Sequence, residues 1–281
     1  MIAAEPPTPC SCMANATVLV LLAVAVIGGT ILLSWSNVFH RFVNSDLPPD
    51  AGRDKPASQH EDDRFAEARR QMVEEQLRGR DITDPRVLEV MGRLARERFV
   101  PEAARKCAYE DHPLPIGLGQ TISQPYIVAL MAQLARPMPD DRALEVGVGS
   151  GYQAAILAGL CRQVYGVEIL DPLATAARQR LAALGYANVA VRCGDGYRGW
   201  PQRAPFDAIL VSAAPDHVPQ PLVDQLAPGG RLVIPVGSRR QELLLIEKRR
   251  DGGFRRGSIA AVQFVPMTGE VERLGPEGDG R

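Results

Sequence analysis

The chain has 281 residues, which is enough for one large domain and a further segment. Hydrophobic residues make up 46% and charged residues 23%, proportions that are ordinary for a globular protein. The net charge of −1 provides no positive field, so we expect no nucleic-acid partner. The five cysteines are scattered, and they include no C-x-x-C pair that would indicate a disulfide framework or a zinc site.

A long apolar run lies near the start of the chain. Residues 16–33 are ATVLVLLAVAVIGGTILL, and no charged side chain occurs between Glu5 and Arg41. A run of this length can cross a hydrocarbon core as a helix. Basic residues follow the run and none precedes it, which places the remainder of the chain in the cytoplasm under the positive-inside tendency. We therefore predict that residues 1–43 form an N-terminal segment with a membrane anchor at 16–33.

Two alternatives to the anchor stay open. A cleaved signal peptide has a basic start and a small-residue cleavage site, but no Lys or Arg precedes Ala16, and residues 34–38 match such a site poorly. A start codon assigned too far upstream would make the segment irrelevant to the native protein. The uncleaved anchor is the favoured interpretation.

Residues 44–63 are rich in Pro, Gly and charged side chains, and we expect them to form a linker before a folded domain at 64–281. The domain is predicted to begin with a helix from Phe65 to Gly79. Asp84 and Pro85 then predict a second helix, with proline in its first turn. Both helices are expected to pack outside a central sheet.

Residues 109–126 read YEDHPLPIGLGQTISQPY, which is rich in Pro, Gly and small polar residues. This composition predicts a long loop, and long loops without regular structure are usually functional.

Residues 142–152, RALEVGVGSGY, follow the pattern of a buried strand and a glycine turn, and a helix-forming segment comes next. This order is typical of the first βαβ unit of a nucleotide-binding fold. The dinucleotide fingerprint is G-x-G-x-x-G, whereas the spacing here is G-x-G-x-G, which weakens an NAD interpretation. Glu145, two residues before the first glycine, instead resembles motif I of the class I S-adenosylmethionine (SAM) methyltransferases.

The next predicted strand, Gln163 to Val167, ends at Glu168. An acid at this position can accept hydrogen bonds from ribose hydroxyls, although NAD proteins use the same device. Further strands are predicted at 189–192, 206–211, 231–235, 243–248 and 259–264, with a helix at 171–184. The predicted fold is α/β: a Rossmann-like, doubly wound and mostly parallel sheet that ends in an antiparallel hairpin, with extra N-terminal helices.

Four separate motifs resemble the protein-L-isoaspartate O-methyltransferase family, and the resemblance extends from about Met72 to about Gly269. They are the run 114–126, the glycine turn, Gly194-Asp195-Gly196, and Val265-Pro266-Met267, where the family has Leu for Met. The resemblance implies methyl transfer from SAM to the free carboxylate of L-isoaspartyl residues in damaged proteins and peptides, which opens a repair route through a succinimide.

The resemblance also implies the site residues. Ser123 is the expected active-site residue, orienting the substrate carboxylate. The expected cofactor-binding residues are Gln120, Thr121, Ile122, Glu145, Gly147, Gly149, Glu168, Asp195, Gly196 and Thr268. A carboxylate is already ionised near neutral pH, so its methylation requires no strong general base. The alternatives are a SAM methyltransferase for another substrate, and a membrane-tethered adapter that binds SAM without catalysis.

The four histidines occur without metal-ligand spacing, so we predict no metal site. His217 lies near the expected rim of the site, where an ordinary surface histidine is favoured over a substrate contact.

Overall fold

The computed structural model describes residues 57–273, with side chains from Asp62 onward. The chain begins there with helix α1 (Ala57–Gln71), which continues as a π-helical segment (Met72–Arg78), and then helix α2 (Pro85–Arg93). The Asp84 carboxylate accepts a hydrogen bond from the Arg86 N–H at 2.9 Å and caps α2, as the Asp-Pro pair predicts. Helix α1 begins at Ala57, before the predicted start at Phe65 and inside the segment 44–63 that the composition predicts as a linker.

Residues 109–126 contain a small hairpin, so the prediction of a loop was partly wrong. Strand β1 (Leu114–Gly117) pairs antiparallel with β2 (Gln120–Ile122), and helix α3 (Pro125–Ala135) follows directly. Gly117, Leu118 and Gly119 all have positive φ angles, of 94°, 53° and 72°, which turn the chain tightly between the strands. The turn at residues 117–119 is exposed, whereas Ile122, at the end of β2 and shortly before α3, is buried.

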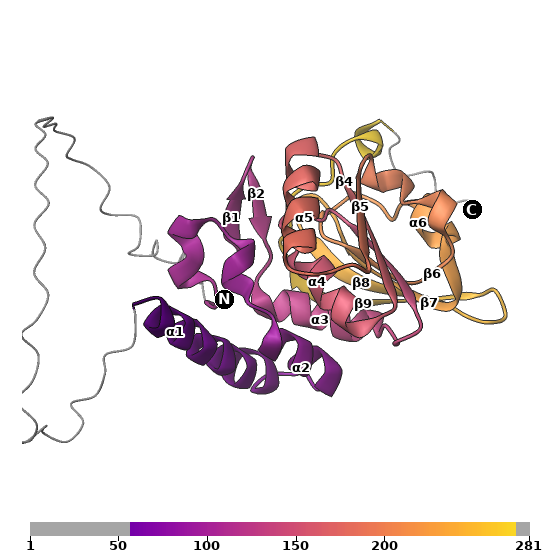
Figure 1. The fold of residues 1–281 in the computed structure, drawn as a ribbon. Helices are drawn as coiled ribbons and strands as arrows, with labels where there is room; N and C mark the ends of the chain where they lie inside the picture. Colours follow the sequence, from indigo (N-terminus) through magenta and orange to yellow (C-terminus); the bar gives the residue numbers. More distant parts are fainter. Residues whose placement is uncertain (1–56, 274–281) are drawn as a thin grey trace, which may run out of the picture. The chain divides into compact units, whose positions relative to one another are not determined.

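The seven-stranded sheet has the order β5-β4-β3-β6-β7-β8-β9 (Figure 1). Five strands are parallel: β3 (Arg142–Val146), β4 (Gln163–Glu168), β5 (Val189–Cys193), β6 (Phe206–Val211) and β7 (Leu226–Val236). The last two, β8 (Gln241–Lys248) and β9 (Phe254–Val262), are antiparallel. The doubly wound, mostly parallel sheet with a terminal antiparallel hairpin is thereby confirmed.

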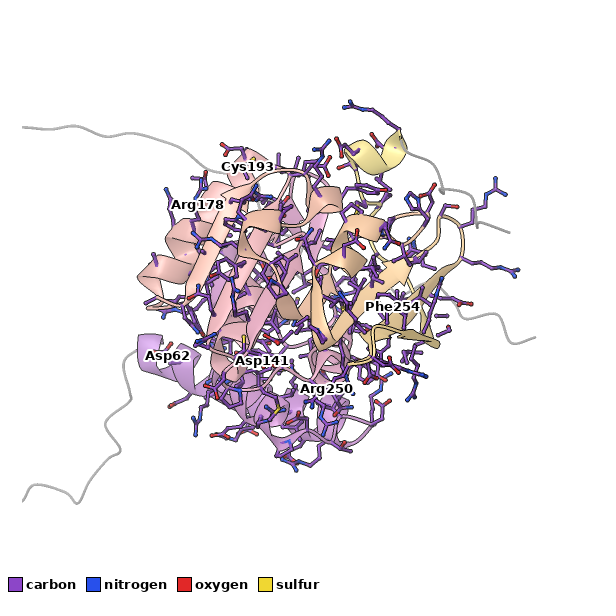
Figure 2. All side chains as sticks on the ribbon, turned by 90° about the vertical axis from the view of Figure 1, so that its right-hand side faces the viewer. Asp62, Asp141, Arg178, Cys193, Arg250 and Phe254 are labelled. Carbon is purple, nitrogen blue, oxygen red and sulfur yellow. The ribbon has the colours of Figure 1, made fainter. Side chains whose placement is uncertain are left out.

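Helices cover both faces of this sheet. Helices α3, α4 (Tyr152–Leu160) and α5 (Asp171–Ala183) lie on one face, and the short helix α6 (Gln220–Asp224) lies on the other (Figure 1). Figure 2 shows side chains crowded between these layers, with Phe254 on the outer strand and Arg178 on the outward side of α5. The main cluster of buried side chains includes Leu144, Val146, Val167, Phe206, Ile209, Val211, Leu232 and Ile234.

Strand boundaries differ from prediction mainly near the end of the chain. The strand predicted at 231–235 is longer, because residues 226–230 also belong to β7. The pairing with β6 shifts register in this added part, and Gly229 adopts a φ of 87°. β9 starts at Phe254 rather than Ile259, because the hairpin turn at 251–253 is tight and pairing resumes at once.

Parallel strands all place their carboxyl ends at one edge of the sheet. The chain leaves β3 at Val146, β4 at Glu168 and β6 at Val211, and these ends are neighbours because β3 lies between β4 and β6. A ligand site is expected at this edge, next to the point where the strand order reverses.

Candidate functional site

A cleft that is open to solvent lies at this edge of the sheet. Its walls come from the ends of β3, β4 and β6, from the hairpin strand β2, and from the segment 265–268 that follows β9. Ten of the eleven predicted site residues line it: Gln120, Thr121, Ile122, Ser123, Glu145, Gly147, Gly149, Glu168, Gly196 and Thr268. The cleft therefore collects four motifs that are far apart in the sequence.

The glycine turn forms the floor between β3 and α4. Gly147, Gly149 and Gly151 have φ angles of 82°, 52° and 88°, a region that side chains with a Cβ rarely occupy. A Cβ on Gly149 would lie 3.3 Å from Ile116 Cδ1, so the hairpin approaches the turn closely. Ile116 of the hairpin therefore packs against the turn.

Glu168 fixes the turn from the neighbouring strand. Its two carboxylate oxygens accept hydrogen bonds from the backbone N–H groups of Gly149 at 2.8 Å and Leu170 at 3.0 Å. The side chain is buried yet lines the cleft. A carboxylate has about four acceptor sites, so Glu168 keeps acceptor capacity for a ligand hydroxyl.

Glu145 is a buried carboxylate at the end of β3. Its side chain is 1% exposed and lines the cleft, and its Oε2 has no hydrogen-bond partner. Burial raises the pKa of the Glu145 carboxyl well above its ordinary value of 4.5, and the charge of Glu168 raises it further. A cationic group in the cleft would find here an acceptor with no other partner.

Ionisation of Glu145 should lower the stability of the ligand-free protein. Folding favours the protonated carboxyl, so stability falls as the pH rises from 4.5, the value for an unperturbed glutamate, through the raised pKa. Glu145→Gln cannot ionise, so its thermal unfolding midpoint should rise relative to wild type as the pH increases above 4.5. For a domain of this size each 1 kcal/mol corresponds to about 2–4 °C.

Scanning fluorimetry across this pH range measures the difference. Glu102→Gln, which changes an exposed glutamate, is the matched control and should show no such trend. A gain for Glu145→Gln that stays constant with pH would contradict the buried, ionising carboxyl.

Ser123 follows β2 and precedes α3, so the hairpin and the helix hold it from both sides. It is half-buried on the wall of the cleft. Its backbone carbonyl accepts a hydrogen bond of 2.7 Å from Arg96 Nη2. The hydrogen bond from Arg96 therefore fixes the backbone at the predicted active-site residue.

Asp195 does not line the cleft. Its carboxylate accepts hydrogen bonds from the backbone N–H groups of Tyr197 at 2.9 Å and Glu270 at 2.7 Å. The first caps a 3-10 turn (Gly196–Arg198), and the second attaches the C-terminal segment to that turn. A contact between Asp195 and cofactor stays a prediction, whereas its backbone neighbour Gly196 faces the cleft.

Ser212 and Ala213 leave β6 at the rim of the cleft, as their place after a parallel strand predicts. Gln153, which the sequence patterns did not single out, also lines the cleft, and its buried Nε2 has no hydrogen-bond partner. Its position directly after the glycine turn is the signal that could have found it. His217 is hydrogen-bonded to Asp216 at 2.6 Å and to the Tyr197 hydroxyl at 3.3 Å, and it is not part of the cleft lining.

Within residues 57–273, no group of three or more His, Cys, Asp or Glu side chains is arranged to hold a metal ion.

Comparison with known proteins shows which family has this arrangement. The family model described as protein-L-isoaspartate(D-aspartate) O-methyltransferase matches residues 67–272, most of the chain. The chain belongs to this family. A protein-L-isoaspartate O-methyltransferase of Synechococcus sp. is 56% identical over 228 residues, covering 78% of this chain and 89% of the relative. A second, from Polaromonas sp., is 57% identical over 194 residues, covering 68% and 92%.

Solved structures of the family share the fold. A protein-L-isoaspartate O-methyltransferase is 27% identical, with a TM-score of 0.65, covering 74% of this chain and 67% of the other. A candidate enzyme of the same family from Plasmodium falciparum, solved in complex with S-adenosyl-L-homocysteine, is 27% identical with a TM-score of 0.63, covering 71% of this chain and 98% of its own. The class I methyltransferase fold predicted from the glycine turn is thus confirmed.

Proposed function

We propose that this chain transfers a methyl group from SAM to the free carboxylate of L-isoaspartyl residues in damaged proteins and peptides, in the cleft at the carboxyl edge of the sheet. The observation that carries the proposal is that one cleft is lined both by the glycine turn and by the segment Gln120–Ser123. The high identity to named relatives along most of their length supports the same function. The methyl ester product closes to a succinimide more readily than the free acid does, which starts repair.

The cleft fits SAM on two observations. The unpartnered, buried Glu145 Oε2 is an acceptor for the amino group of the methionine part. The glycine turn removes side chains where the backbone must approach a ligand, and Glu168 has acceptor capacity for ribose hydroxyls. When bound, SAM supplies a methyl carbon that its sulfonium charge has already activated. We assign the remaining contacts to Gln120, Thr121, Ile122, Gly147, Gly149, Asp195, Gly196 and Thr268.

The protein residues contribute position rather than proton transfer. An isoaspartyl carboxylate has an ordinary pKa near 4, so it is ionised at neutral pH and no general base is needed. We assign to Ser123 the donation of its O–H to one carboxylate oxygen, which aligns the other oxygen for attack. Alignment of this kind and exclusion of water are the main sources of rate enhancement in such a site.

A methyl-transfer assay with matched peptides tests the proposal. Two peptides of one sequence, which carry either an L-isoaspartyl or an L-aspartyl residue, are incubated with the full chain and labelled SAM. We expect base-labile methyl esters on the isoaspartyl peptide and none on the L-aspartyl peptide. Methylation of neither peptide, with SAM bound, would support the non-catalytic adapter, and methylation of the L-aspartyl peptide alone would support a different carboxyl substrate.

The membrane anchor at 16–33 lies outside the described residues. Within residues 57–273 no helix is long and apolar enough to cross a membrane. The proposal for 16–33 therefore rests on the sequence pattern alone. It places the catalytic domain in the cytoplasm, where SAM is made.

Fractionation of cells that express the untagged chain tests this location. The protein should sediment with membranes, and the catalytic domain should resist protease added to intact spheroplasts. Deletion of residues 1–43 should move the protein to the supernatant. Wild-type protein found only in the supernatant, or wild-type protein whose N-terminus lies after residue 40, would contradict the anchor.

A further inference from the structure

Arg96 is a fully buried cation that contacts two residues of the cleft lining, Ser123 and Tyr152. It lies on a 3-10 turn (Arg96–Phe99), and its side chain is 0% exposed. No salt bridge to a carboxylate joins its guanidinium among the described residues, and its Nη1 has no hydrogen-bond partner. Burying a charge that has no salt-bridge partner is costly, and a methionine of similar length would avoid that cost. The position therefore calls for an explanation from what the guanidinium contacts.

The guanidinium connects three segments. Its Nε donates to the Ala108 carbonyl at 2.7 Å, and its Nη2 donates to the Ser123 carbonyl at 2.7 Å. Its Cζ lies 4.7 Å from the centre of the Tyr152 ring, at the start of α4 directly after the glycine turn. One side chain thus bridges the segment before the hairpin, the segment after it, and the helix that leaves the cofactor turn.

The backbone of Arg96 is also held in place. Its N–H donates a hydrogen bond to the Tyr109 hydroxyl at 3.2 Å. That hydroxyl donates to the Glu97 carboxylate and accepts a hydrogen bond from Arg69 Nη1 at 3.1 Å. Tyr109 is itself buried. Because both ends of Arg96 are fixed, its fork has a defined direction toward the Ser123 carbonyl.

We propose that Arg96 is a positioning residue for substrate, which sets the place of the Ser123 hydroxyl by holding the peptide group of Ser123. This inference rests on the proposed role of Ser123. A guanidinium suits the task because its planar fork donates in two fixed directions at once, here to Ala108 and Ser123. A lysine ammonium carries the same charge on a flexible stem and cannot hold both carbonyls in that geometry.

A double-mutant cycle between Arg96→Lys and Ser123→Ala tests the proposal. In the wild-type background, Arg96→Lys should lower kcat/KM for an isoaspartyl peptide about tenfold, while the Kd for S-adenosyl-L-homocysteine changes less than about threefold. In the Ser123→Ala background the same substitution should lower kcat/KM by less than about threefold, since there is no hydroxyl left to misplace. Arg98→Lys, an exposed change on the same 3-10 turn, is the control and should match wild type.

Each other outcome overturns the inference. If Arg96→Lys costs the same in both backgrounds, Arg96 serves only the fold. If Ser123→Ala is impaired and Arg96→Lys is not, Ser123 keeps its role and Arg96 has none. If Ser123→Ala matches wild type, the role of Ser123 fails and the inference fails with it. Should Arg96→Lys not fold, Tyr109→Phe, which removes the hydroxyl that fixes the Arg96 backbone, must show the same dependence on Ser123 with a smaller loss.

Discussion

Ser123→Ala is expected to lower methyl transfer to an isoaspartyl peptide by about 10- to 1000-fold, the range for loss of an orienting hydrogen bond in a preorganised site. The affinity for SAM should stay within about threefold of wild type, since a single hydroxyl on the substrate side of the cleft is removed. The reason is geometric. Ser123 is half-buried and lies between β2 and α3, and its carbonyl accepts a hydrogen bond from Arg96. These contacts fix the backbone from which its hydroxyl projects.

Turnover and peptide KM under saturating SAM provide the measurement. Ser123→Thr retains the hydroxyl and should keep part of the activity. Ser258→Ala, which removes an exposed hydroxyl on the outer strand β9, is the matched control. Wild-type turnover and peptide KM in Ser123→Ala would show that backbone groups of the same segment position the carboxylate.

The parallel sheet could be predicted because its signals are local. Buried strands such as Phe206–Val211 are apolar apart from Asp207, and glycines at 147, 149 and 151 are needed where φ is positive. Since each strand's carboxyl end could be placed in the sequence, Glu145 and Glu168 could be assigned to one edge of the sheet before any coordinates.

The hairpin at 114–122 could not be predicted in the same way. Its strands are four and three residues long, they pair only with each other, and they contain proline and glycine. Such a segment has no pattern of alternation long enough to detect. What stabilises it is the packing of distant residues, since Ile122 is buried and Ile116 approaches Gly149.

Asp195 and Arg96 both make contacts that the motifs do not reveal. The motif predicts Asp195 next to the cofactor, and the structure adds that its carboxylate oxygens accept hydrogen bonds from two backbone N–H groups, one of them that of Glu270, far along the chain. No motif singled out Arg96, although it contacts the residue on which the mechanism depends. Both outcomes follow from tertiary contacts that spacing in the sequence does not encode.

Glu168→Ala is expected to weaken SAM binding by about 10- to 100-fold, because hydrogen bonds to a charged group are worth about 1.5–3 kcal/mol and about 1.4 kcal/mol is a factor of ten. Two effects act together. The ribose hydroxyls lose their acceptor, and Gly149 N–H, now held at 2.8 Å by Glu168, loses the bond that fixes the glycine turn. Glu168→Gln keeps one oxygen acceptor and should lose less affinity than Glu168→Ala.

Calorimetry with SAM and with S-adenosyl-L-homocysteine measures the loss, and circular dichroism checks that the variant stays folded. Asp171→Ala is the matched control, because Asp171 is an exposed acid in the first turn of α5, three residues beyond Glu168, and should bind as wild type does. The role of Glu168 depends on burial at the end of β4, next to the turn, rather than on negative charge in this region. Equal losses of SAM affinity in Asp171→Ala and Glu168→Ala would point to a general electrostatic effect of negative charge. Unchanged SAM affinity in Glu168→Ala would contradict the assignment of this cleft to SAM. Tight binding of NAD by the wild-type chain would contradict it as well.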